Sequence, residues 1–65
     1  MGAGYGRELT KLLRENGCKF IRYGKGDHQI WYSPKSNRQV ILDYGTKDKN
    51  TANGTLKQAG IKHKL

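Results

Sequence analysis

The sequence CKFIRYGKGDHQIWYSPKSNRQVILD, residues 18–43, contains three short segments rich in β-branched and aromatic side chains. A Gly-Lys-Gly turn follows the first segment, and a Pro-Lys-Ser-Asn turn follows the second. Strand formers bounded by glycine and proline predict β-strands at residues 18–23, 27–33 and 38–43. Because both connections are short, the three strands are expected to pair as an antiparallel meander.

The middle strand should present different side chains to the two faces of the sheet, because side chains alternate along a strand. His28, Ile30 and Tyr32 fall on one face. Gln29 and Trp31 fall on the other. Whichever of Trp31 and Tyr32 points away from the rest of the protein is a candidate contact for a partner.

Helices are expected on both sides of this stretch. Leu9, Leu12 and Leu13 recur at helical spacing and form one apolar stripe within residues 6–16. Asn16 and Gly17 then form a helix stop, in which the glycine can take the left-handed conformation.

A second helix is expected over residues 51–59, with Asn50 or Thr51 as its N-cap and Leu56 on its inner side. The element order is therefore α-β-β-β-α. This order predicts a single small α+β domain, in which two helices cover one face of a three-stranded antiparallel sheet. The other face would meet solvent or a partner.

The chain is short and strongly basic, with 65 residues, 13 Lys or Arg, 5 Asp or Glu and a net charge of +8. This length allows one small domain and leaves no room for a cofactor domain or a deep pocket. We expect a flexible leader at residues 1–6, the domain at 7–61 and a basic tail at 62–65. One cysteine, Cys18, cannot form an internal disulfide. No apolar run approaches the length of a membrane span, and the start lacks the pattern of a signal peptide, so a cytoplasmic location is expected.

The positive charge favours a nucleic acid as partner, because clustered Lys and Arg release the counterions condensed on phosphates. Two other interpretations remain open. One is a membrane surface, which requires a basic amphipathic helix with an apolar opposite face. The other is a solvated surface without a specific partner.

His28 is the main candidate for chemistry, because it begins a strand directly after the Gly-Lys-Gly turn. A neutral imidazole can act as a general base. RNA supplies its own nucleophile, the 2′-hydroxyl, so a nuclease of this kind needs no metal and no cofactor. The carboxylates are scattered along the chain and predict no metal site. The residues alone leave a purely structural role for His28 open.

Several other residues have two interpretations each. The glycines beside Lys25 either expose amides that hold a phosphate or serve only the turn. Trp31 either stacks on a base or covers the core. The candidate RNA-binding residues are Lys25, Gly26, Arg38, Lys47 and Lys49.

Three motifs together resemble the HicA-type toxins, also called YcfA-like mRNA interferases. They are RELTKLLRENGCKFIR at residues 7–22, GKGDHQIW at 24–31 and NGTLKQAGI at 53–61. They stand in the order and spacing of that family and cover nearly the whole chain. The resemblance implies a double-stranded-RNA-binding-like fold and assigns the active-site histidine to His28. Some members of the family have a second histidine where this chain has Gln29.

The resemblance also implies the toxin of a type II toxin–antitoxin system, which cuts mRNA, inhibits translation and is neutralised by a HicB-type antitoxin. With a single histidine, the proton for the leaving 5′-oxygen must come from water, a lysine or His28 itself. The alternative is a non-catalytic double-stranded-RNA-binding module, because the same fold and charge serve both functions. In that module Lys47 and Lys49 would straddle a groove of the duplex. A DNA-binding regulator is disfavoured, because the sequence lacks helix-turn-helix spacing.

Overall fold

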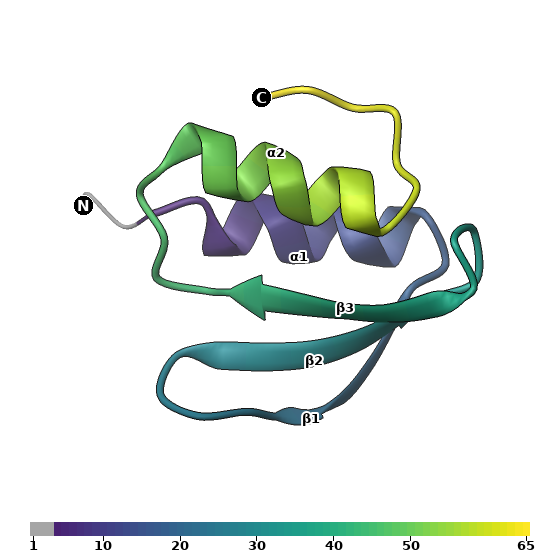
Figure 1. Ribbon diagram of the computed structural model, residues 1–65, viewed down its shortest axis with the longest axis horizontal. Coiled ribbons are helices and arrows are strands. Elements are labelled where there is room, and N and C mark those ends of the chain that lie inside the picture. The colour runs from purple at the N-terminus through teal and green to yellow at the C-terminus, as the bar shows by residue number, and fades with distance from the viewer. Residues whose placement is uncertain (1–3) are drawn as a thin grey trace.

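The computed structural model describes residues 4–65, which form two helices and a three-stranded sheet (Figure 1). In chain order the elements are α1 (Gly6–Glu15), β1 (Lys19–Tyr23), β2 (His28–Ser33), β3 (Arg38–Asp43) and α2 (Lys49–Gln58). The strands lie in the order β1-β2-β3, and both neighbouring pairs are antiparallel. The predicted α-β-β-β-α fold with an antiparallel meander is confirmed.

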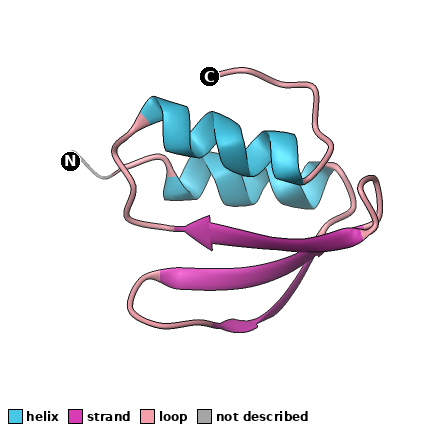
Figure 2. Cartoon of the chain, viewed as in Figure 1, coloured by secondary structure: helices cyan, strands magenta, loops and turns pink. Residues whose placement is uncertain are grey.

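The two helices lie side by side on one face of the sheet, where both contact β3 (Figures 1 and 2). The core between the layers takes apolar side chains from α1, β2, β3, α2 and the segments that follow the two helices. Its buried members are Leu9, Leu13, Cys18, Trp31, Val40, Leu42, Ala52, Leu56, Ala59 and Ile61. All residues of β1 are exposed, so this edge strand extends the sheet beyond the core. Within residues 4–65, neither helix has the length and apolar character needed to cross a membrane.

The two faces of β2 have different environments. Trp31 is 2% exposed and faces the helices, where it belongs to the core. Its neighbour Tyr32 faces away from the helices, and its hydroxyl donates a hydrogen bond to Oδ1 of Asn37 at 2.5 Å. Of the two aromatic residues singled out in the sequence, Tyr32 is therefore the one on the open face of the sheet.

The ends of the helices follow their local sequence. Gly17 has a φ of 81° and Gly60 a φ of 76°, as expected for glycines that end helices. Helix α2 begins two residues earlier than predicted, and its N-cap is Asp48, so the predicted caps Asn50 and Thr51 are wrong. The carboxylate of Asp48 accepts a hydrogen bond from the N–H of Asn50 at 2.8 Å. A negative charge at this end also interacts favourably with the helix dipole.

Strand β1 departs from the regular side-chain alternation of a β-strand. Its register against β2 shifts between Phe20 and Arg22, so Ile21 is an extra residue and forms a β-bulge. In a regular strand, residues three apart point to opposite faces. The bulge instead brings Phe20 and Tyr23 to the same face, where their ring centroids lie 5.0 Å apart.

Both described ends of the chain contact the domain. Residues 1–3 of the expected leader lie outside the described residues. The N–H of Tyr5 donates to the carbonyl of Thr46 at 2.8 Å, and Tyr5 packs against the core. In the expected basic tail, the N–H of Leu65 donates to Oδ1 of Asn53 at 2.8 Å. These bonds attach residues at each end of the described chain to the loop before α2 and to α2 itself.

Candidate functional site

The hairpin between β1 and β2 holds His28 in place. The N–H of Gly24 donates to the carbonyl of His28 at 2.7 Å, and the N–H of His28 donates to the carbonyl of Lys25 at 3.1 Å. Gly26 has a φ of 61°, a conformation that glycine adopts without strain, so the turn itself requires a residue of this kind. The side chain of His28 is exposed and is accessible to a large substrate.

The surroundings of the His28 ring favour one tautomer. Its Nδ1 lies 2.8 Å from the backbone carbonyl oxygen of Lys25. Because a carbonyl oxygen only accepts hydrogen bonds, this partner assigns the proton to Nδ1. In the neutral ring the lone pair then resides on Nε2, the nitrogen on the other side of the ring. This is the arrangement that a general base requires.

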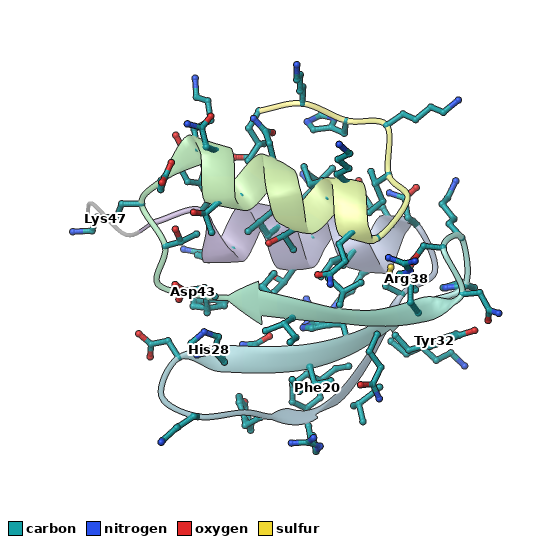
Figure 3. All side chains as sticks on the ribbon, viewed as in Figure 1. Phe20, His28, Tyr32, Arg38, Asp43 and Lys47 are labelled. Atoms are coloured by element: carbon teal, nitrogen blue, oxygen red, sulfur yellow. The ribbon has the colours of Figure 1, made fainter. Side chains whose placement is uncertain are left out.

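Two acidic residues lie at the same end of the sheet as His28. Asp43 is its register partner on β3, and directly opposed residues have Cβ atoms about 4.5–5.5 Å apart (Figure 3). Oδ1 of Asp43 accepts the N–H of Gly45 at 3.2 Å. The backbone carbonyl of Asp27 accepts the N–H of Tyr44 at 3.1 Å, which ties the hairpin to the end of β3. Across residues 4–65, no three His, Cys, Asp or Glu side chains are grouped as a metal site requires.

Four of the five candidate RNA-binding residues lie in the hairpin or between β3 and the start of α2. Lys25 and Gly26 belong to the turn that, with Asp27, precedes His28. Lys47 lies in the loop after β3, at the same end of the molecule as His28 (Figure 3). Lys49 is the first residue of α2 rather than part of that loop. The side chains of the three lysines are exposed.

Arg38 lies away from this group. It begins β3 and pairs with Ser33, whereas His28 pairs with Asp43 at the other end of the strand. Strand β3 is 6 residues long, so its ends lie roughly 17 Å apart at about 3.4 Å per residue. The structure therefore does not bring Arg38 to His28.

Trp31 was expected either to stack on a base or to cover the core, and the structure shows that it covers the core. Its Nε1 donates to Oε1 of Gln29 at 2.9 Å. The ring of Phe20 packs edge-on against it, with centroids 5.8 Å apart and an interplanar angle of 76°. The guanidinium carbon of Arg14 lies 5.6 Å from the Trp31 ring centroid. Cys18 is likewise buried in the core.

A groove that was not predicted from the sequence runs between α1 and β1. It forms because the helices lie over β3 and the adjoining side of β2 and leave the helix-side face of the edge strand β1 open (Figure 1). Its lining combines basic side chains of α1 with aromatic side chains of the sheet and of Tyr44, the residue after β3. The main lining residues are Arg7, Lys11, Arg14, Phe20, Tyr23 and Tyr44. The basic half of this lining could be expected from the sequence. Arg7, Lys11 and Arg14 are spaced four and then three residues apart, and residues at this spacing lie on one face of a helix.

Comparison with models of known protein families matches residues 6–61 to the family described as the HicA toxin of bacterial toxin–antitoxin. No curated protein and no solved structure matches the chain. The family match spans both helices, all three strands and the turn that holds His28.

Proposed function

Because the chain belongs to the HicA toxin family of bacterial toxin–antitoxin pairs, we propose that it is an mRNA interferase with His28 as its general base. The observation that carries this proposal is the 2.8 Å contact between His28 Nδ1 and the carbonyl oxygen of Lys25. In the neutral ring this contact keeps the proton on Nδ1 and leaves the lone pair on Nε2, on a side chain that an RNA strand can reach.

In the proposed reaction, Nε2 of His28 takes the proton of an RNA 2′-hydroxyl. The 2′-oxygen forms a bond to the adjacent phosphorus, and the bond from phosphorus to the 5′-oxygen breaks. The products carry a 2′,3′-cyclic phosphate and a 5′-hydroxyl. Three donors fit the protonation of the leaving oxygen: the imidazolium just formed, a lysine, or water.

The charges around His28 suit this reaction. Lys25 lies in the same turn, and its ammonium can hold the scissile phosphate as negative charge builds on it. Asp43, directly opposite His28, can stabilise the imidazolium that forms when the ring accepts the proton. Lys47, at the same end of the molecule, can bind a neighbouring phosphate (Figure 3).

An antitoxin is the second partner, because the family consists of toxins from toxin–antitoxin pairs. We propose that a HicB-type protein neutralises this toxin in the cytoplasm by covering His28. A net charge of +8 favours an acidic contact surface on that partner. The affinity should then fall as the salt concentration rises, because screening weakens exposed charge pairs.

Cleavage is expected to continue when metal ions are removed, because the proposed base is a side chain and the nucleophile belongs to the RNA. The assay incubates purified protein with labelled mRNA, with and without excess EDTA, and compares initial rates. Activity that disappears in EDTA and returns with magnesium would contradict metal-independent cleavage.

The same assay distinguishes a nuclease from a binding module. A non-catalytic double-stranded-RNA-binding module would bind RNA without cutting it. Its binding would weaken in the Lys47→Gln, Lys49→Gln double variant and would not change in His28→Ala. Lys57→Gln, an exposed lysine further along α2, serves as the matched charge control.

A further inference from the structure

The groove between α1 and β1 presents two aromatic rings on a strand edge. Tyr23 is 72% exposed and Phe20 is 43% exposed, although both are large apolar rings. The bulge at Ile21 places them on one face, and the pair packs edge-to-face against each other. The inner ring, Phe20, rests on Trp31, so the core holds the pair from below. Exposed rings that are held rigidly in this way can stack on flat ligands.

The opposite wall of the groove is basic. Arg7, Lys11 and Arg14 lie on one face of α1 and line the groove together with a single acidic side chain, Glu8. Helix positions that recur every three to four residues follow the helix axis at about 1.5 Å per residue. The first and last of these cations are thus roughly 10 Å apart along α1, a span that covers more than one phosphate of an extended strand.

One end of the groove lies at the same end of the sheet as His28, although the His28 side chain is on the opposite face. Tyr23 pairs with Gln29, the residue directly after His28. Tyr44 also lines the groove, and it follows Asp43, the register partner of His28. Gln29 faces the groove and His28 faces the open side of the sheet, so an RNA strand that leaves the groove at Tyr23 and Tyr44 has to pass around the end of the sheet to reach His28.

We propose that the α1–β1 groove binds single-stranded RNA, with bases stacked on Tyr23 and Phe20 and phosphates held by Arg7, Lys11 and Arg14. The inference rests on the proposed function, because it assigns to the groove the same RNA that His28 cuts. Stacking requires free base faces, which a single strand offers and a duplex keeps inside its own stack. Three cations against one carboxylate match a phosphate backbone. The substrate class is therefore unpaired RNA rather than duplex.

Binding is measured by fluorescence anisotropy in the His28→Ala background, with one labelled RNA as a single strand and as a hairpin duplex. The unsubstituted groove should bind the single strand more tightly. Tyr23→Ala should weaken that binding by about 10-fold or more, which is the usual cost of a lost base–aromatic stack. Tyr23→Phe keeps the ring and should stay within about twofold.

The charged wall is tested through the salt dependence of the same binding. Lys11→Gln should reduce the slope of log affinity against log salt concentration by about 0.7, the value for one phosphate contact on a single strand. Lys57→Gln on α2 lies outside the groove lining and should leave slope and affinity unchanged. Circular dichroism checks that all variants fold, which the exposure of these side chains favours.

Three results would overturn the groove proposal. They are an unchanged affinity of Tyr23→Ala for the single strand, tighter binding of the duplex than of the single strand, and groove variants that lose binding to the antitoxin but keep binding to RNA. The last result would identify the groove as a protein-docking surface. If any of these results accompanies cleavage that depends on His28, the groove proposal fails and the proposed function stands. If the groove variants weaken binding as expected but the native protein cuts no RNA, the groove proposal stands and the proposed reaction fails.

Discussion

Replacing His28 with alanine is expected to slow RNA cleavage by about 10²- to 10⁴-fold, the range for loss of a general base. The variant loses the Nε2 atom that would take the 2′-proton, and no described element brings a second histidine to this end of the sheet. Initial rates with a labelled mRNA fragment measure the effect. In cells, the same variant should no longer arrest growth when it is produced without antitoxin.

The control for this variant is His63→Ala. His63 is exposed in the segment after α2, outside the hairpin and outside the groove. We expect its cleavage rate to equal that of the unsubstituted protein. Because the His28 side chain is exposed, its removal should leave the thermal midpoint nearly unchanged. Equal cleavage by the His28→Ala protein and the native protein would contradict the assignment of the base.

Replacing Trp31 with alanine is expected to destabilise the domain by about 3–5 kcal/mol, as for other large aromatic residues removed from a core. Trp31 is 2% exposed and joins β2 to the helix layer, while Phe20 packs on its ring from β1. Small domains have a total stability of about 5–15 kcal/mol, so this change removes much of it. Urea unfolding followed by circular dichroism measures the loss.

The neighbouring residue provides the matched control, because it is aromatic and points to the opposite face. Tyr32 is half-buried on the open side of the sheet, and its hydroxyl bonds to Asn37. Tyr32→Ala should therefore cost about 1 kcal/mol or less. If the two variants were equally destabilised, the assignment of the sheet faces would be wrong.

The fold could be predicted from the sequence where a local pattern and its environment agree. Strand β3 and the start of α1 lie at the predicted residues, because turn residues and a leucine stripe mark their boundaries. The start of α2 differs, because Asp48 caps the helix two residues earlier than the apolar stripe indicates. The bulge at Ile21 was not predicted. The consecutive apolar residues Phe20 and Ile21 interrupt the alternation of residues 18–23, but only the pairing with β2 shows that Ile21 is an extra residue.

The candidate site could be predicted only in part, because some of its features arise from tertiary contacts. The place of His28 after a glycine turn is visible in the sequence, but its tautomer depends on a backbone carbonyl that folding brings to Nδ1. Arg38 is basic like the other candidates, yet the length of β3 carries it to the far end of the sheet. The aromatic side of the groove requires both the bulge and the overhang of β1 beyond the helices, and both are tertiary features.

The most direct test of the proposed reaction is a chemical analysis of the RNA ends. The cleavage position is first mapped on an unmodified RNA, and the same RNA is then made with a single 2′-deoxy nucleotide at that position. We expect the unmodified RNA to yield a 2′,3′-cyclic phosphate and a 5′-hydroxyl, and the 2′-deoxy bond to remain intact. Cleavage of the 2′-deoxy bond, or products with a 5′-phosphate, would contradict attack by the 2′-oxygen and with it the role of His28 as the base.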